Sequence, residues 1–224
     1  MPAKAKSAVK RVMIVDDHPM MRQGLAQLID NEPDLKVVAE ADTGGQGLDL
    51  AIKEKLDLSV LDISLPDKNG LELIKDIRSV RPELPILIIS MHDEALYAER
   101  VLRAGARGYI MKQEGGKKLL QAIRQVLTGQ IYVSEKMSAR ILETFSGHAS
   151  EQSSSPVARL SDREFEVFQL IGQGKGTKEI AQHLNLSVKT VEVHRANIKE
   201  KLSLQTATDL VRFAVRWAEA QGTV

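Results

Sequence analysis

The chain has no cysteine among its 224 residues, which excludes disulfides and thiolate chemistry and fits a reducing cytosol. It also lacks any apolar run near the ~18–20 residues of a membrane span, and the basic segment MPAKAKSAVK has no apolar core of a secretory signal. Neither charge dominates, because 31 Lys and Arg residues face 30 Asp and Glu residues. We therefore expect a globular, cytoplasmic protein of one large or two smaller domains, with no membrane partner.

The first half of the chain alternates short apolar runs with longer stretches of helical spacing, of which Leu71, Ile74 and Ile77 are an example. Strands that alternate with helices predict right-handed crossovers and a parallel sheet covered on both faces. The expected strands are residues 12–15, 37–39, 58–61, 86–89 and 108–111. Residues 10–130 are thus expected to form a five-stranded, doubly wound α/β domain of the flavodoxin-like type.

Beyond this domain the apolar runs typical of strands stop. Residues 134–145 have the spacing of one short helix, and the Ser-rich stretch 146–158 has the composition of a flexible linker. We therefore expect residues 131–158 to connect two domains.

A second, small all-α domain is expected over residues 159–221. Ser161 and Glu164 have the spacing of a capping box that begins a helix. Three further helices are expected near 176–184, 188–202 and 207–218. Four helices without strands complete the predicted architecture.

Charged and polar residues follow the strands of the first domain. Asp16 and Asp17 follow the first strand, Asp62 ends the third, Ser90 ends the fourth, and Lys112 follows the fifth. In an open parallel sheet, ligands bind beyond the carboxyl ends of the strands. The sequence therefore predicts one site that combines three acids, a hydroxyl and an amine.

This set of groups has a readable chemistry. Neighbouring carboxylates repel one another unless a cation compensates them, and hard oxygen ligands with open positions suit Mg²⁺ beside a phosphoryl group. Lys112 can neutralise a bound anion, and Ser90 can donate a hydrogen bond to it. The assembly fits phosphoryl transfer to Asp62 as an aspartyl phosphate. The sequence has no Gly-rich Walker loop, which disfavours ATP as the direct donor.

The same residues resemble the receiver domain of bacterial two-component response regulators. The resemblance covers residues 10–130 and rests on the Asp-Asp pair, the D-x-x-x-P-x-x-x-G run (Asp62, Pro66, Gly70), Ser90 and Lys112. It implies that Asp62 accepts a phosphoryl group from the phosphohistidine of a sensor histidine kinase. It also implies that Asp17, Asp62 and the backbone carbonyl of Ser64 ligate Mg²⁺, with Asp16 helping through water.

The resemblance implies a switch as well. Ser90 would move onto the phosphoryl oxygens, and Tyr109 would rotate inward as Ser90 shifts. One departure is visible, because the family often has proline after the lysine and Gln113 stands here. A cis peptide in that loop is therefore not carried over, whereas the role of Lys112 is.

Other interpretations of the same residues stay open. An Asp-Asp pair at a strand end also serves as a turn or a helix cap, and Tyr109 also fits a core position. A haloacid-type hydrolase uses an Asp after a strand too. That hydrolase needs a second acid two residues later, where this chain has Ser64.

The second domain contains a motif for DNA. Residues 177–202 combine a short helix, a tight turn with Ser187 as N-cap, and a longer helix, which is the pattern of a helix-turn-helix that reads the major groove. With its flanking helices the segment resembles the four-helix LuxR-type DNA-binding domain. Together with a receiver, it resembles response regulators of the NarL/FixJ type.

Helical geometry selects the candidate DNA contacts. Candidate phosphate contacts are Lys178, Lys189, Thr190, Arg195 and Lys199. Glu192, Val193 and Ala196 are candidates for base edges. Two alternatives stay open: Glu192 pairs with a basic neighbour, and His194 packs internally. The apolar stripe of the last helix, from Leu210 to Val215, fits either a dimer interface or the core.

We therefore expect a DNA-binding transcriptional regulator that is switched by phosphorylation at Asp62 and is not an enzyme. Its partners would be a sensor histidine kinase, Mg²⁺, double-stranded DNA and, when phosphorylated, a second copy of the chain. One alternative is a regulator whose receiver-like half acts without phosphorylation. A less favoured alternative is an aspartyl-phosphate phosphatase.

Overall fold

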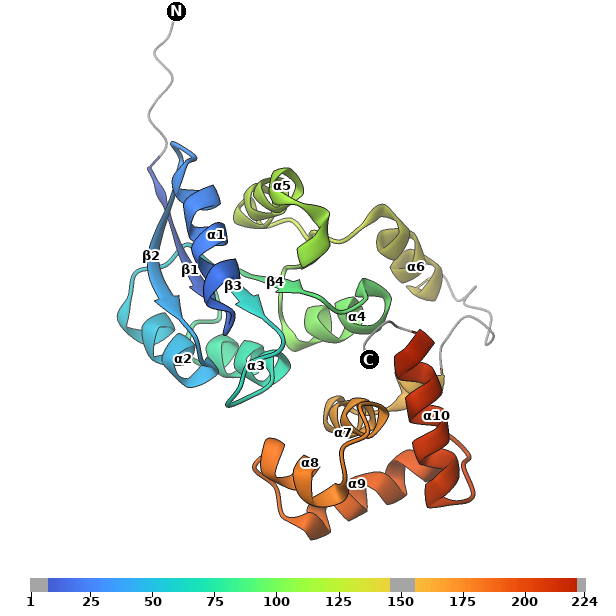
Figure 1. Cartoon of the computed structure of the whole chain (residues 1–224). Helices are drawn as coiled ribbons and strands as arrows, with labels where there is room; N and C mark the ends of the chain where they lie inside the picture. Colours follow the sequence, from blue (N-terminus) through green and yellow to red (C-terminus); the bar gives the residue numbers. More distant parts are fainter. Residues whose placement is uncertain (1–7, 146–155, 221–224) are drawn as a thin grey trace, which may run out of the picture. The chain divides into compact units, whose positions relative to one another are not determined.

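The structure, a computed structural model, describes residues 8–145 and 156–220 (Figure 1). The chain divides into two compact units, Met1–Ile141 and Leu142–Val224. We call them the N-terminal and the C-terminal unit and describe each by itself. The first contains a sheet with helices on its two faces, and helices build the described part of the second.

The N-terminal unit contains the predicted five-stranded parallel sheet, in the order β2-β1-β3-β4-β5. The strand order reverses next to β1, so the carboxyl ends of β1 and β3 flank the crevice where such sheets bind ligands. The strands are β1 (Lys10–Val15), β2 (Leu35–Ala41), β3 (Leu58–Asp62), β4 (Ile86–Ser90) and β5 (Gly108–Met111).

Helices cover both faces of this sheet (Figure 1). Helices α1 (Pro19–Asp30) and α5 (Gly116–Leu127) pack on one face, where Leu25, Ile29 and Ile123 join a buried cluster with strand residues such as Ile14. The helices of the opposite face are α2 (Gly44–Lys53), α3 (Gly70–Val80) and α4 (Glu94–Ala104). The doubly wound arrangement confirms the predicted fold class.

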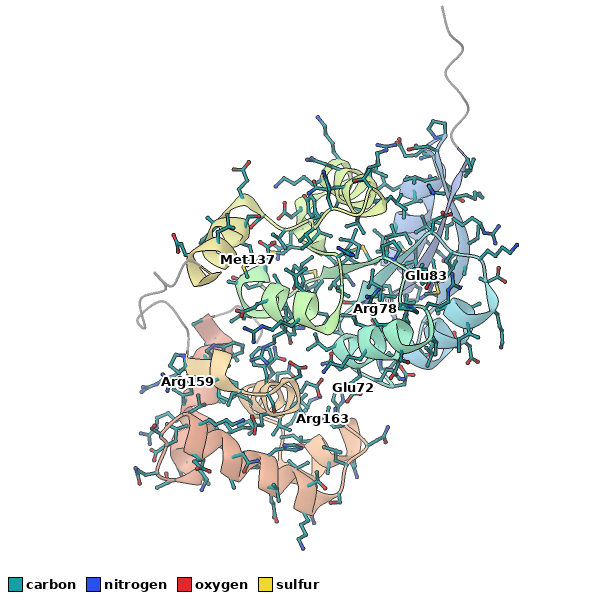
Figure 2. The ribbon with its side chains drawn as sticks, turned by 180° about the vertical axis from the view of Figure 1, so that it is seen from behind. Glu72, Arg78, Glu83, Met137, Arg159 and Arg163 are labelled. Atoms are coloured by element: carbon teal, nitrogen blue, oxygen red, sulfur yellow. The ribbon has the colours of Figure 1, made fainter. Side chains whose placement is uncertain are left out.

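The segment after α5 adds a short pairing to the β5 edge. The backbone N–H of Tyr109 donates to the carbonyl of Tyr132 at 2.9 Å, and Tyr132 N–H donates to the carbonyl of Arg107 at 3.0 Å. Helix α6 (Glu135–Phe145) follows, close to the predicted bounds, and its Met137 (Figure 2) is buried. The backbone N–H of Ser134 donates to Glu94 Oε1 at 2.7 Å, so the start of α6 is tied to the start of α4.

The C-terminal unit begins before the predicted capping box. A short 3₁₀ helix, η2 (Pro156–Arg159), holds Val157 with 1% of its surface exposed, although this residue falls in the segment predicted as linker. The remaining linker residues, 146–155, lie outside the described part of the chain. The helices that follow are α7 (Asp162–Gly172), α8 (Thr177–His183), α9 (Val188–Lys201) and α10 (Ala207–Ala220).

Local capping and aromatic packing hold this unit together. Ser161 N–H donates to Glu164 Oε2 at 2.8 Å, and the Glu164 N–H donates to Ser161 Oγ at 3.4 Å, so the capping box at α7 is present. Trp217 of α10 meets Phe165 and Phe168 of α7 edge to face, at centroid distances of 5.7 and 5.3 Å. Such aromatic pairs stabilise a core beyond the area that they bury.

Candidate functional sites

Lys112 joins the two carboxylates that end neighbouring strands. Its Nζ atom lies 2.7 Å from Asp62 Oδ2 and 2.8 Å from Asp16 Oδ2. All three side chains are at most 3% exposed. The structure therefore brings these predicted site residues together at the carboxyl edge of β1 and β3.

Local backbone contacts fix the orientation of both acids. Asp16 Oδ1 accepts a hydrogen bond from His18 N–H at 2.9 Å, which is the local turn that the alternative interpretation expected. Asp16 therefore takes part both in this turn and in the ion pair with Lys112. Asp62 Oδ1 accepts from Ser64 N–H at 3.3 Å. At Gly70 a Cβ atom would lie 2.7 Å from Ile63 Cα and 2.8 Å from the Asp62 carbonyl. Glycine is therefore required for α3 to start so close to the end of β3.

Burial and charge act against each other in this cluster. Burial raises the pKa of Asp62 and the charge of Asp16 adds to it, whereas the hydrogen bond and charge of Lys112 act in the opposite direction. Burial opposes the charged form of Lys112, but its bonds to Asp16 and Asp62 prevail and raise the pKa of its ammonium group. The lysine thus stays cationic beside two acids whose mutual repulsion is only partly compensated.

The oxygen atoms of the cluster fit a hard cation. Ligand atoms of Asp16, Asp17, His18 and Asp62 lie within 4.8 Å of one another. The buried oxygens Asp16 Oδ2 and Asp17 Oδ1 lack a well-directed hydrogen bond. Asp16 Oδ2 nevertheless lies 2.8 Å from Lys112 Nζ, and Asp17 Oδ1 lies 2.7 Å from His18 Nδ1. Carboxylate oxygens with spare acceptor capacity are ligands that Mg²⁺ prefers. His18 belongs to this group and was not predicted.

The two predicted switch residues meet at the loop after β4. Ser90 is fully buried and its Oγ accepts a hydrogen bond from His92 N–H at 3.1 Å. Tyr109 is also fully buried, and its hydroxyl donates to the carbonyl of His92 at 2.7 Å. Burial raises the pKa of the Tyr109 phenol, so the hydroxyl remains a donor. In this structure the Tyr109 side chain is buried, which supports the core interpretation of this residue.

His92 is a part of the site that sequence patterns did not reveal. Besides its bonds to Ser90 and Tyr109, its Nε2 lies 3.1 Å from Ser64 Oγ, and its ring stacks on Tyr97 at 4.9 Å. Burial and the charge of Lys112 lower the pKa of the imidazole. The signal available in the sequence was weak, because a histidine two residues past a strand belongs to no recognisable motif.

In the C-terminal unit, side chains of α7 hold the helix-turn-helix through polar contacts. Glu164 is 4% exposed and accepts a hydrogen bond from Lys201 Nζ at 2.6 Å, which ties α7 to the end of α9. Arg163 (Figure 2) donates to the carbonyl of Leu184 at 2.9 Å and so binds the end of α8. The carboxyl ends of both helices of the motif are therefore anchored on α7.

The outer surface of α9 carries most of the predicted DNA contacts. Ser187 caps this helix, since its Oγ accepts from Thr190 N–H at 3.0 Å. Val191 and Ile198 are fully buried and form the inner face of this helix. The predicted residues that are exposed are Lys178, Lys189, Glu192, Val193 and Ala196. Val188, which was not predicted, is also 40% exposed at the start of the helix.

Three predicted contacts are only partly exposed. The hydroxyl of Thr190 lies 2.7 Å from Ser187 Oγ, within the helix cap. Arg195 and Lys199 are half-buried. Burial lowers the pKa of the Arg195 guanidinium, and the described residues offer it no carboxylate. Its cation is thus available to an anionic partner, whereas Thr190 already serves the cap.

The structure also bears on the open alternatives in this unit. Glu192 is exposed and has no ion pair within the described ranges, which leaves the base-edge interpretation in place. His194 is half-buried and burial lowers the pKa of its imidazole, which favours packing. The stripe on α10 divides, because Leu210 and Ala214 are fully buried while Val211 is 39% exposed.

Comparisons with known proteins show the family of this chain. Residues 12–124 match the model of the response regulator receiver domain, and residues 158–214 match that of the bacterial regulatory proteins of the luxR family. The oxygen regulatory proteins NreC of Staphylococcus haemolyticus and Staphylococcus aureus are 37% identical over 92% of this chain and 97% of theirs. The chain therefore belongs to the response regulators that join a receiver to a LuxR-type domain.

Solved structures support the same assignment. A structure of the response regulator RcsB from Salmonella typhimurium, on conformational dynamism for DNA interaction, is 26% identical over 93% of this chain and 98% of that chain, with a TM-score of 0.72. Another, of RcsB from Salmonella enterica serovar Typhimurium bound to promoter rprA with the phosphomimetic BeF₃⁻, is 26% identical over 92% and 98%, with a TM-score of 0.68. Among the described helices, none is long and apolar enough to cross a membrane.

Proposed function

We propose that this chain is a transcriptional regulator of a two-component system in which Asp62 is the phosphoacceptor. The observation that carries the proposal is the bridge from Lys112 to Asp16 and Asp62 at the carboxyl ends of β1 and β3. A carboxylate oxygen of Asp62 attacks the phosphorus of a phosphohistidine on a sensor kinase. The N–P bond breaks, an acyl phosphate forms and the imidazole leaves.

The chain's own residues prepare this transfer. Lys112 and the Ser64 N–H hold the carboxylate of Asp62 in one orientation. Asp16, Asp17 and Asp62, with the backbone carbonyl of Ser64, would hold Mg²⁺. When bound, this ion would neutralise charge between the acids and the incoming phosphoryl group. Lys112 would then pair with a phosphoryl oxygen.

The switch that we propose runs through the loop after β4. Ser90 exchanges its contact with His92 N–H for a phosphoryl oxygen, and the loop that Tyr109 holds through the His92 carbonyl shifts with it. Phosphorylation favours this state only as far as the new contacts differ in free energy from the old ones. The result is a population shift that dimerises or releases the C-terminal unit on double-stranded DNA, in the cytoplasm.

DNA recognition would follow the exposed surface of α9. Lys178, Lys189, Thr190, Arg195 and Lys199 would bind phosphates, which position the helix in the major groove. Glu192, Val193 and Ala196 would contact base edges. The structure of two RcsB dimers bound to two parallel DNAs supports a dimer on DNA for this chain as well.

The acyl phosphate would be a signal and not a turnover intermediate. Ser64 stands where a haloacid-type hydrolase needs a second acid, and Asp62 itself is only 2% exposed. Slow single turnover therefore fits the site better than hydrolysis of small phosphoesters. Multiple turnover of such an ester, abolished in Asp62→Ala, would show instead that the chain is a phosphatase.

The direct test treats the full chain with a small acyl phosphate and Mg²⁺. We expect one base-labile phosphoryl group per chain, none in Asp62→Asn, and tighter binding to DNA that has been selected from a random-sequence pool. Phosphorylated wild type that binds this DNA no better than the untreated protein contradicts the switch. It would favour the alternative of a regulator that acts without phosphorylation.

A further inference from the structure

The loop between β3 and α3 is fastened at its tip to a different helix. The carboxylate of Asp67 accepts two hydrogen bonds, from Gly44 N–H to Oδ1 and from Gly45 N–H to Oδ2, each at 2.7 Å. Gly44 and Gly45 are the first two residues of α2. The first N–H groups of a helix have no partner within it, and they attract anions.

Asp67 completes the N-terminus of α2. The helix's own cap, Thr43, accepts from Gln46 N–H at 3.3 Å through its side chain and from Gly47 N–H at 3.0 Å through its carbonyl. The two N–H groups that remain are those that Asp67 binds. The start of α2 and the tip of the β3–α3 loop therefore satisfy each other's polar groups.

The two glycines allow this approach. A Cβ atom at Gly44 would lie 2.4 Å from Lys68 Cγ and 3.3 Å from Asp67 Oδ1. At Gly45 it would lie 3.2 Å from Asp67 Oδ2. A side chain at Gly44 would therefore require the Lys68 side chain to shift and would crowd the Asp67 carboxylate, so the absence of side chains at the GG pair favours the contact with Asp67.

Backbone hydrogen bonds close the base of the same loop, next to the proposed phosphoacceptor Asp62. Gly70 N–H donates to the carbonyl of Ile63 at 2.8 Å, and Ser64 pairs with Asn69 in an isolated bridge. Ser64 N–H also donates to Asp62 Oδ1. Ser64 therefore lies between Asp62, to which its N–H is bonded, and the tip of the loop, which Asp67 holds. A shift of either end would move the backbone of Ser64.

We propose that Asp67 is a positioning residue for the metal site. By fastening the loop to α2, it holds the backbone of Ser64 where the carbonyl can ligate Mg²⁺, without touching the ion itself. Although partial burial opposes ionisation, the N–H groups of Gly45 and Gly44 hold the pKa of Asp67 below its usual value, so the carboxylate stays charged. The inference rests on the proposed function, because it takes the Ser64 carbonyl as a ligand.

The test compares Mg²⁺ affinity between two full-chain variants by isothermal titration calorimetry with MgCl₂. Asp67→Ala should bind Mg²⁺ on the order of 10-fold more weakly than wild type, as is typical when a group that orients a ligand is lost. Asp57→Ala is the matched control. Asp57 is also a loop acid that accepts a backbone N–H, from Arg11 at 2.8 Å, but it directly precedes β3 and so lies at the amino end of this strand, away from Asp62 at the carboxyl end. Its variant should bind Mg²⁺ like wild type.

A second variant and a metal-free measurement separate positioning from folding. Asp67→Asn keeps the size of the side chain and one acceptor oxygen, so it should fold and bind Mg²⁺ between wild type and Asp67→Ala. Hydrogen exchange without Mg²⁺ should be faster at the amides of Gly44 and Gly45 in both Asp67 variants and unchanged in Asp57→Ala.

Each outcome decides something. Equal Mg²⁺ affinity in wild type, Asp67→Asn and Asp67→Ala overturns the positioning role and leaves the proposed function intact. Equal weakening in the Asp57 and Asp67 variants overturns it too, because general destabilisation would then explain both. A wild type that binds no Mg²⁺ overturns the metal site of the proposed function and this inference with it.

Discussion

The ammonium group of Lys112 lies 2.7 Å from Oδ2 of Asp62, and both side chains are 3% exposed. Because a second buried acid, Asp16, lies 2.8 Å from the same nitrogen, one cation compensates two anions away from solvent. Removing one partner from a buried ionic group leaves uncompensated charge in the interior. The resulting loss in the free energy of unfolding is larger than the contribution of an exposed ion pair.

Replacement of Lys112 by methionine should therefore destabilise the N-terminal unit strongly. We expect the free energy of unfolding to fall by about 3–5 kcal/mol, as measured by urea denaturation. Mg²⁺ should restore more stability to this variant than to wild type, because a cation that binds only the folded state stabilises it.

Lys118→Met is the control for this prediction. Lys118 is 59% exposed and pairs with Glu114 one turn away, so its loss should change the free energy of unfolding far less than the loss of Lys112 does, because solvent screens an exposed ion pair. Equal unfolding free energies for the two variants would contradict a compensating role for Lys112.

Tyr109→Phe tests the contact between β5 and the loop after β4. The variant loses the hydroxyl that donates to the His92 carbonyl, so the free energy of unfolding should fall by about 1 kcal/mol. Phosphoryl incorporation at Asp62 should persist, while the gain in DNA affinity on phosphorylation should shrink. Tyr132→Phe is the control, because no hydrogen bond of its hydroxyl occurs in the described ranges. A Tyr109→Phe protein with the full gain in affinity would rule out a switching role.

The bond between Glu94 and the Ser134 N–H predicts a local effect on α6. In Glu94→Ala the amides at the start of α6 should exchange with solvent about 5-fold faster, since about 1 kcal/mol of local stabilisation is lost. Hydrogen exchange measured by mass spectrometry resolves this segment. Glu99→Ala removes an exposed pair with Arg103 on the same helix and should leave α6 unchanged. Equal exchange in both variants would mean that Glu94 does not fix the start of α6.

Glu164 gives the C-terminal unit a defined pH dependence. Burial opposes its ionisation, but bonds from Lys201 and Ser161 prevail and lower its pKa. A lowered folded pKa contributes stability that is present above the unfolded value of about 4.3 and is lost as the pH falls through the folded value.

Glu164→Gln should consequently unfold about 1.5–3 kcal/mol more easily than wild type at pH 7. This difference should narrow as the pH falls below about 4.3 and through the lower folded value, because the wild-type carboxylate then becomes protonated too. Denaturation followed by circular dichroism across this pH range checks it. Glu200→Gln, an exposed acid on α9, should show no such dependence. A difference for Glu164→Gln that stays constant with pH would contradict the charge-based explanation.

Two substitutions on α9 should separate affinity from specificity. Lys189→Ala should weaken binding to all DNA sequences alike and reduce the slope of affinity against salt by about 1, as expected for a phosphate contact. Glu192→Gln should instead change which bases are preferred at one position. Binding to DNA selected from random pools, at several salt concentrations, distinguishes them. Lys117→Ala in α5 should change neither the DNA affinity nor the base preference. A loss of affinity in Glu192→Gln that is the same for all DNA sequences would contradict a base contact.

Much of the fold could be predicted because its signals are local. The apolar runs of β3, β4 and β5 were located to within one residue, since these strands are buried on both faces and read as continuous apolar segments. The edge strand β2 was predicted too short, as 37–39. It runs from Leu35 to Ala41 and alternates buried with exposed residues such as Glu40, so its polar positions hid its ends.

Some residues of the candidate site could likewise be predicted from the sequence, and others could not. Asp16, Asp62 and Lys112 could be grouped from sequence, because the carboxyl ends of parallel strands must share one edge. The bonds of Asp67 and of His92 could not, since each joins loops that are distant in sequence and obeys no periodicity. Such contacts depend on how two loops approach each other, which only the folded chain determines.

The packing of Trp217 against Phe165 and Phe168 has a spectroscopic consequence, because Trp217 is the only tryptophan in the chain. Its fluorescence reports on the α7–α10 core alone, and no tryptophan signal arises from the N-terminal unit. Together with the absence of cysteine, this leaves the chain ready for one introduced thiol and one dye on the N-terminal unit. Each unit can then be followed separately within the intact protein.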